Sequence, residues 1–267
     1  MNHAAGFNFG LALSGGGVRT VAQVGIIEVM MNIGISPNIV SGTSGGAIVA
    51  ALLAAGNSPQ QMMEFFTSTT FFHWSKFAMS KAGLLDPEKF IEAFLKFVPF
   101  ENFEELPIQL KVVTTDLLAG EERVIEKGNI VKAVLASAAF PGVFEPVKIN
   151  NRPFVDGGIF NNVPANIIRD SCKYLIGIDV NPVVAVKEKD LQTAISVIKR
   201  SFELMSRYQT IQARENCDLY ITPEGTDQYS LFDIQKANEL YLLGKKEGKK
   251  YENRFKSLAQ LIAPNQN

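Results

Sequence analysis

A serine between glycines is the residue in this sequence best suited to nucleophilic chemistry. Ser44 lies within Gly42-Thr43-Ser44-Gly45-Gly46, after a short apolar run and before an Ala-rich stretch. A Gly-x-Ser-x-Gly sequence between a strand and a helix is typical of a nucleophile elbow, because glycines leave room around the exposed hydroxyl. The following helix would direct its positive dipole end at an oxyanion. The alternative is a plain turn, which the flanking strand and helix disfavour.

A triple glycine ends the first apolar run of the chain. Gly15, Gly16 and Gly17 offer successive backbone amides that no side chain covers, so they are suited to binding an anion. A dinucleotide site requires G-x-G-x-x-G and a later acidic residue, but Thr20 replaces the last glycine and residues 36–40 contain no acid. The P-loop Lys-Ser/Thr is also missing. We therefore favour an oxyanion hole over a nucleotide site or simple strand–helix packing.

The base that would activate Ser44 is not an obvious histidine. The sequence contains two histidines, His3 and His73, and none follows residue 73. The usual α/β-hydrolase order of Ser, acid and His therefore cannot be built. We expect His3 to lie in a frayed terminus and His73 to be a core or lid residue, with His73 as the weaker alternative base. A Ser-x-x-Lys arrangement is excluded because residue 47 is alanine.

Asp156 is the stronger candidate for the base. It follows the expected hairpin strand Pro153-Phe154-Val155 and begins the turn Asp156-Gly157-Gly158, in which glycines permit close backbone approach. The alternative is an aspartate that only caps this turn. An unperturbed aspartate has a pKa about 2.6 units below that of histidine, or about 3.5 kcal/mol less proton affinity. A Ser-Asp dyad therefore requires burial of the carboxylate or an efficient oxyanion hole.

The elements that must position these groups alternate along the chain. We expect strands at 7–13, 38–41, 108–115, 147–155 as a hairpin, 175–180 and 219–222. We expect helices at 21–32, 47–55, from residue 59, from residue 87, from residue 130 to Pro141, at 190–216 and at the C-terminal end. The strands are almost continuously apolar. This pattern predicts an α/β fold with a mostly parallel central sheet and helices on both faces.

The composition is that of one large globular domain spanning residues 1–267. It is 46% hydrophobic and 20% charged, with 26 basic and 27 acidic residues, which argues against a nucleic-acid groove. Its two cysteines, Cys172 and Cys217, are expected to be buried thiols in a reducing compartment. No secretory signal and no apolar run of about 18 residues is recognisable. We expect a cytoplasmic protein that can contact a membrane surface peripherally, and the sequence leaves its oligomeric state open.

Four blocks together resemble the patatin-like phospholipase family, and the resemblance covers most of the chain. They are, in order, Gly15-Gly16-Gly17-Val18-Arg19, Gly42-Thr43-Ser44-Gly45-Gly46, Ala136-Ser137-Ala138-Ala139-Phe140-Pro141 and Asp156-Gly157-Gly158. The resemblance implies a single domain with a three-layer α/β/α sandwich. It also implies that Ser44 is the nucleophile and Asp156 the base.

The resemblance assigns further roles to the first block. The oxyanion donors would be amides of Gly15, Gly16, Gly17 and Val18, and Arg19 would place a charge near the hole. Arg19 is alternatively an ordinary surface or ion-pair residue. This sequence departs from the family at Thr20, where glycine is usual, which puts the geometry of the hole in question.

The activity implied by the resemblance is hydrolysis of acyl lipid esters, of phospholipase A or lysophospholipase type. It would proceed through an acyl-enzyme and require no metal or cofactor. Two alternatives stay open. An acyltransferase would use the same acyl-enzyme with another acceptor, and a catalytically silent protein would bind lipid or regulate a partner.

Two further segments bear on lipid binding. Residues 62–79 concentrate aromatic side chains, so we expect a lid or pocket wall at about residues 60–100, with ordinary core packing as the alternative. The basic run GKKEGKKYENRFK near the end could meet anionic lipid or form a solvated helix face. Asp116 and Asp179, at expected strand ends, are interpreted as turn or capping groups.

Overall fold

The computed structural model describes residues 7–68 and 87–262 of the chain. Its centre is an eight-stranded sheet of order β5-β6-β3-β2-β1-β7-β8, with β4 paired to β3 off this path. The strands are β1 (Phe7–Leu13), β2 (Ile39–Thr43), β3 (Gln109–Asp116), β4 (Glu121–Ile125), β5 (Val147–Ile149), β6 (Arg152–Asp156), β7 (Cys172–Ile178) and β8 (Leu219–Ile221). The pairs among β3, β2, β1, β7 and β8 are parallel, whereas β4, β5 and β6 add antiparallel pairs. The α/β fold with a mostly parallel sheet is thus confirmed.

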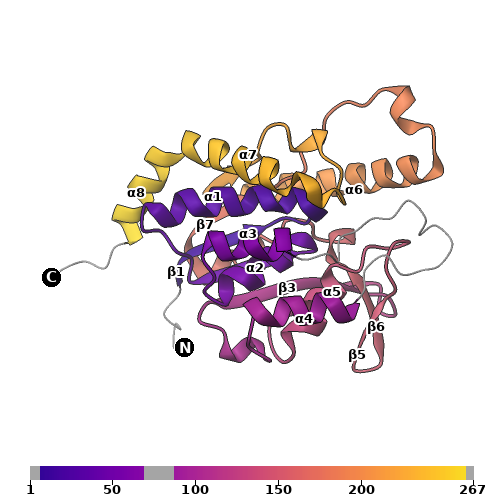
Figure 1. Cartoon of the computed structure of the whole chain (residues 1–267), viewed down its shortest axis with the longest axis horizontal. Coiled ribbons are helices and arrows are strands. Elements are labelled where there is room, and N and C mark those ends of the chain that lie inside the picture. Colours follow the sequence, from indigo (N-terminus) through magenta and orange to yellow (C-terminus); the bar gives the residue numbers. More distant parts are fainter. Residues whose placement is uncertain (1–6, 69–86, 263–267) are drawn as a thin grey trace.

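Helices surround this sheet (Figure 1). They are α1 (Val21–Asn32), α2 (Gly45–Ala54), α3 (Pro59–Ser68), α4 (Pro87–Phe97), α5 (Ile130–Ser137), α6 (Ala194–Asn216), α7 (Ala237–Lys250) and α8 (Glu252–Ile262). Helices α1 and α7 lie side by side at very short range. A Cβ atom on Gly244 would lie 1.9 Å from the Ala22 carbonyl oxygen, so this crossing requires glycine.

The two faces of the sheet are covered differently. Alternate residues of β1, such as Phe9 and Leu11, join the large core formed with α1 to α5, α7 and α8. Ala12 joins a smaller cluster on the other face, which is completed by residues 163–168 and by Ala213 of α6. Because the sheet is apolar on both sides, both faces must be covered. One side is covered by many helices, and the other by an irregular segment and one side of α6.

Most expected elements are present, with a few differences. Strand β4 was not expected, because its sequence Glu-Glu-Arg-Val-Ile is too polar to resemble a buried strand. The single helix expected at the C-terminal end is two helices, α7 and α8, separated at Tyr251. The expected hairpin is β5–β6, and its turn residues Asn150 and Asn151 have φ angles of 50° and 62°. Asparagine tolerates this left-handed region better than most residues do, which explains the turn.

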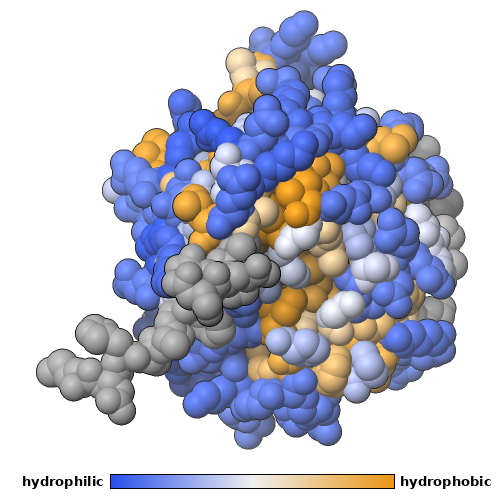
Figure 2. Space-filling model, turned by 90° about the vertical axis from the view of Figure 1, so that its left-hand side faces the viewer, coloured by the Kyte–Doolittle hydropathy of each residue, from blue (hydrophilic) through white to orange (hydrophobic). Residues whose placement is uncertain are grey.

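None of the helices in the described part of the chain combines the length and apolarity needed to cross a bilayer. The end of the molecule facing the viewer in Figure 2 is mostly hydrophilic, with hydrophobic residues in a central band. The organisation into one domain with a lid stays a prediction, since residues 69–86 lie outside the described ranges.

Candidate active site

Ser44 lies at the sharp turn between β2 and α2. Its φ and ψ angles are 53° and −127°, a conformation that is strained for any residue with a side chain. The flanking glycines are required sterically: a Cβ atom on Gly42 would lie 2.6 Å from the Gly46 carbonyl oxygen, and one on Gly46 would lie 2.3 Å from that of Ser14. The strand–turn–helix context therefore holds Ser44 in a rare conformation at the N-terminus of α2, as a nucleophile elbow does.

A second serine fixes the backbone of Ser44. The Ser44 amide donates to Oγ of Ser137 at 2.8 Å, and this hydroxyl donates to the Val113 carbonyl at 2.6 Å. Ser137 is fully buried at the end of α5. The sequence analysis named Ser137 only as one residue of the segment 136–141 and did not predict this role. The available signal was a polar side chain in an Ala-rich helix, because a buried hydroxyl needs a partner.

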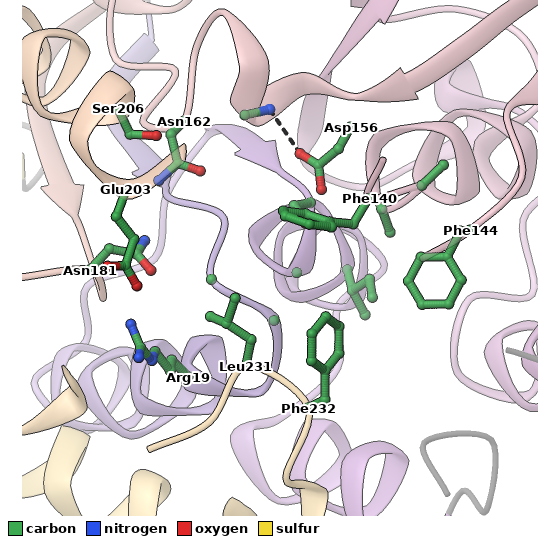
Figure 3. Close-up of a pocket in the computed structure, with 18 of the residues that line it drawn as sticks. Arg19, Phe140, Phe144, Asp156, Asn162, Asn181, Glu203, Ser206, Leu231 and Phe232 are labelled. Atoms are coloured by element: carbon green, nitrogen blue, oxygen red, sulfur yellow. Dashed lines mark hydrogen bonds between the residues drawn. The ribbon is translucent and has the colours of Figure 1, made fainter. Parts of the chain in front are cut away.

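Asp156 ends β6 and is held from two sides. Its backbone amide donates to the Ala139 carbonyl at 3.0 Å, and its Oδ1 accepts a hydrogen bond from the Gly158 amide at 2.8 Å. A Cβ atom on Gly157 would lie 2.3 Å from the Val113 carbonyl oxygen, so glycine lets this turn approach β3. The Asp156 side chain is thus fixed at the edge of a cavity, as Figure 3 shows.

The surroundings of Asp156 make its carboxylate a stronger base than usual. Only 3% of the residue is exposed, and burial raises its pKa from 3.8 to about 6. The shift is opposed by the Gly158 amide, which donates to the carboxylate, and by the nearby Ser44 hydroxyl. The fold therefore brings Ser44 and Asp156 together at the wall of one cavity.

The triple glycine passes beside Ser44, and its amides are not equivalent. The outer two amides of the expected donor set are already engaged: Gly15 donates to the Asn162 carbonyl at 3.0 Å, and Val18 to that of Leu231 at 2.8 Å. They do not fit the role of oxyanion donor. The amides of Gly16 and Gly17 have no acceptor within the described ranges.

Glycine is needed at these inner positions. The φ angles of Gly16 and Gly17 are 148° and 55°, and a Cβ atom on Gly17 would lie 2.1 Å from the Leu231 carbonyl oxygen. Gly45 packs against the same turn, since its Cβ would lie 2.7 Å from the Gly17 carbonyl oxygen. Its amide, directly after Ser44, also has no acceptor among the residues described. This adds a donor that sequence reasoning had assigned only to the motif.

Arg19 and Thr20 stabilise the surroundings of the glycine turn: Thr20 bonds to the turn itself, and Arg19 to the segment of residues 227–229. Arg19 is 4% exposed, and its guanidinium donates to the carbonyls of Tyr229 at 2.8 Å and Asp227 at 3.3 Å. Burial lowers its pKa, against the attraction of Glu203 and Asp227. The Thr20 hydroxyl donates to the Gly17 carbonyl at 2.7 Å, so the residue that departs from the family pattern holds the glycine turn in place.

Ser44 and Asp156 line a cavity of about 380 Å³. One part of its wall is apolar and includes Ile48, Phe66, Phe90, Leu135, Phe140, Phe144 and Val147. Another part is polar and includes Arg19, Asn162, Asn181, Glu203, Ser206 and Thr210. In Figure 3, Phe140 and Phe144 lie to one side of Asp156, and Arg19, Asn181 and Glu203 lie together on the other. The cavity thus has separate apolar and polar sides beside the reactive groups.

The remaining predicted residues are the two histidines, the aromatic run and two aspartates. His3, His73 and most of the aromatic run lie outside the described residues, although Phe65 and Phe66 are buried and Phe66 lines the cavity. Asp116 accepts hydrogen bonds from the amides of Leu118 and Ala119, as a turn group does.

Asp179 also has a structural role. Its carboxylate accepts hydrogen bonds from the Asn181 amide at 3.0 Å and the Tyr220 hydroxyl at 2.9 Å. Within the described ranges, no group of three or more potential metal ligands comes together.

Comparisons with known proteins show the family of this chain. The sequence model of the patatin-like phospholipase family matches residues 11–168, which include Ser44 and Asp156. The chain belongs to the patatin-like phospholipase family. An uncharacterized NTE family protein of Mycobacterium tuberculosis is 32% identical over 199 residues, covering 70% of this chain and 52% of the relative. The mouse patatin-like phospholipase domain-containing protein 6 is 28% identical over 205 residues, covering 70% of this chain and 14% of that protein.

A solved structure shows the same patatin-like phospholipase fold. VipD from Legionella pneumophila superposes with a TM-score of 0.53 at 16% identity, over 94% of this chain and 68% of that chain. The chain spans about half the length of the mycobacterial relative. The family match ends before β7, so the cavity wall contributed by Asn181, Glu203 and Leu231 lies outside the matched region.

Proposed function

We propose that this protein is a serine acyl-ester hydrolase that acts on acyl lipids, as a phospholipase A or lysophospholipase. Ser44 is the nucleophile and Asp156 the general base. The observation that carries the proposal is the position of the strained Ser44 beside a buried Asp156, whose pKa burial raises to about 6, at the wall of a partly apolar cavity. Raised carboxylate pKa values in cavities are characteristic of catalytic groups.

In the first step, Oγ of Ser44 attacks the ester carbonyl carbon while its proton passes to the Asp156 carboxylate. The carbonyl oxygen becomes an oxyanion, which accepts hydrogen bonds from backbone amides. The amides of Gly16, Gly17 and Gly45 suit this role because they are close to Ser44 and have no acceptor in the described chain. The N-terminus of α2 adds its positive dipole end at the same place.

In the second step, the tetrahedral intermediate expels the alcohol. Protonated Asp156 gives its proton to the leaving oxygen, and the acyl group stays bonded to Ser44. A water molecule then attacks the acyl-enzyme while Asp156 accepts its proton. The carboxylic acid leaves, Oγ of Ser44 regains a proton from Asp156, and no cofactor takes part.

Burial makes the aspartate suitable for these proton transfers. A pKa of about 6 approaches the value of about 6.5 of free histidine, the commonest general base. The energetic deficit of an ordinary carboxylate is therefore largely removed before the oxyanion donors act.

The cavity supports an acyl lipid as substrate. The phenylalanine side, including Phe66, Phe90 and Phe140, suits an acyl chain, and the side with Arg19, Asn181 and Glu203 suits a polar head group. The cysteines of the described chain, Cys172 and Cys217, are both unpaired thiols, which supports a cytoplasmic site of action.

Labelling with a fluorophosphonate, together with fatty-acid release from phospholipid micelles, tests the dyad. We expect no labelling of Ser44→Ala, and labelling of Asp156→Asn slowed by at least about a hundredfold, because a general base contributes that much. Ser257→Ala is the matched control: this exposed serine on α8 lies away from the cavity, so it should behave as wild type. Equal labelling of wild type and Ser44→Ala would reject the assignment. Product analysis with an added alcohol acceptor separates hydrolase from acyltransferase.

A further inference from the structure

Helix α6 exposes an apolar face to the surroundings. We call this the α6 outer face, and its residues are between 46% and 68% exposed: Val197, Ile198, Leu204, Met205, Tyr208 and Ile211. Four of them follow one another at intervals of seven, four and three residues, which places them on one side of the helix. A helix at the surface of a globular protein usually turns such a face toward the core.

The inner side of α6 explains this inverted orientation. Glu203, Ser206 and Thr210 line the cavity. The Gln209 side chain accepts a hydrogen bond from the Asn162 amide at 3.0 Å and donates one to the Ile159 carbonyl at 2.9 Å. Polar contacts with the site thus fix the rotation of the helix and leave its apolar residues outside.

The segment before α6 leads from the cavity to the helix, and the Arg200 guanidinium of α6 donates to the Val184 carbonyl at 2.9 Å. Pro182 and Val183 line the cavity, and the following Val184 and Val186 are 41% and 39% exposed. In Figure 1, α6 and the segment before it lie at the edge of the molecule. Exposed apolar residues therefore lie both on the segment that leaves the cavity and on the outer side of the helix.

Positive charge borders this surface. Arg200, Arg207 and Arg214 recur at seven-residue intervals and so form a row along one edge of the helix. Arg200 contacts Glu203, and the Arg214 guanidinium lies 5.1 Å from the centre of the Tyr220 ring, while Arg207 is exposed. An apolar face with a basic edge complements an anionic lipid surface.

We propose that the α6 outer face docks this protein onto a lipid bilayer that contains anionic lipids. The helix lies in the plane of the interface, with its apolar residues among the upper acyl chains and the arginine row among the head groups. Docking in this orientation brings the cavity rim to the membrane. The inference rests on the proposed function for its purpose, because a lipid substrate must reach Ser44 from the bilayer. A protein bound to this face would lie beside the cavity rim without supplying a lipid substrate.

Vesicle flotation with the full chain tests the proposal. The vesicles consist of phosphatidylcholine alone or mixed with phosphatidylglycerol. The variant Leu204→Gln/Met205→Gln/Ile211→Gln should bind mixed vesicles at least about tenfold more weakly, because affinity follows buried apolar area. Arg207→Gln should lose about fivefold on mixed vesicles and little on neutral ones.

Matched controls separate this surface from general hydrophobicity. Leu242→Gln/Leu261→Gln removes leucines of α7 and α8 that are 62% and 76% exposed, and it should bind as wild type does. Equal loss in this control, or no binding of wild type to either vesicle, would overturn the proposal. It would also be overturned if the triple variant converted a dimer to a monomer and still bound vesicles.

Turnover of a water-soluble short-chain ester distinguishes failure of docking from failure of the proposed function. The triple variant should keep wild-type turnover, since its substituted residues do not line the cavity. Ser44→Ala should lose turnover but bind vesicles normally. A chain that hydrolyses the ester without binding vesicles rejects docking alone, and one that binds without hydrolysis rejects the proposed function alone.

Discussion

Two buried aspartates on the paired strands β3 and β6 have opposite properties. The strands are antiparallel, with Thr114 opposite Asp156 and Asp116 opposite Phe154, so the carboxylates belong to the same short ladder. Asp116 accepts a hydrogen bond from Nε of Arg152 at 2.7 Å, and this contact lowers its pKa to about 2. For Asp156, burial raises the pKa to about 6, and the opposing contacts are neutral donors.

The difference comes from the immediate partners of each carboxylate and not from the strands. Strand β6 begins with Arg152 and ends with Asp156, so it supplies the cation for Asp116 and keeps its own carboxylate remote from it. An ion pair stabilises the charged form, whereas burial without a cation stabilises the neutral form. The first arrangement holds a turn, and the second raises the proton affinity of the carboxylate, as the proposed role of Asp156 as a base requires.

The largest expected difference between the two aspartates is the effect of their replacement on kcat/KM. We expect Asp156→Asn to lower kcat/KM for a p-nitrophenyl acyl ester by about a thousandfold, because the base is lost while the shape is kept. Asp116→Asn should stay within about threefold of wild type, since Asp116 does not line the cavity. Steady-state kinetics of both variants check this, and comparable losses in the two would contradict the division.

Replacing the two aspartates by asparagine should change the free energy of unfolding at pH 8 in opposite directions. The folded-state pKa of Asp156 lies above its unfolded value, so ionisation costs stability above about pH 6 and nothing below about pH 3.8. Asp156→Asn should therefore raise the free energy of unfolding at pH 8, by up to about 3 kcal/mol, and leave it almost unchanged at pH 4.

Asp116 provides the reverse case. Its folded-state pKa is lowered, so its contribution to stability is present above its unfolded value of about 3.8 and is lost as the pH falls through about 2. Asp116→Asn should then lower the free energy of unfolding at pH 8. Urea unfolding of both variants measures these changes, and a shift of the same sign in both would refute the comparison.

The pH dependence of turnover gives the smallest effect. Because Asp156 must be ionised to accept the proton, kcat/KM should rise about tenfold from pH 5 to pH 8, with a midpoint near 6. The Asp116→Asn variant should keep this midpoint. A flat profile, or a midpoint near 4 in wild type, would show that burial does not tune Asp156 as described.

The sequence predicted several local structures correctly. The glycines around Ser44 predicted its strained turn, and the two asparagines of 147–155 predicted the β5–β6 hairpin. Strand β4 was not predicted, because its polar sequence forms a strand only through pairing with β3. The amides of Gly15 and Val18 were misjudged because their acceptors, Asn162 and Leu231, lie far along the chain.

The sequence by itself determined the turns that hold Ser44 and Asp156, because turn geometry and the need for glycine are local properties. Only the tertiary structure decided what surrounds these two residues. It brought Ser44 of one crossover and Asp156 of a distant hairpin to the wall of one cavity, buried the carboxylate, and directed the apolar side of α6 outward. These outcomes depend on burial and on contacts between segments remote in sequence, which no local pattern encodes.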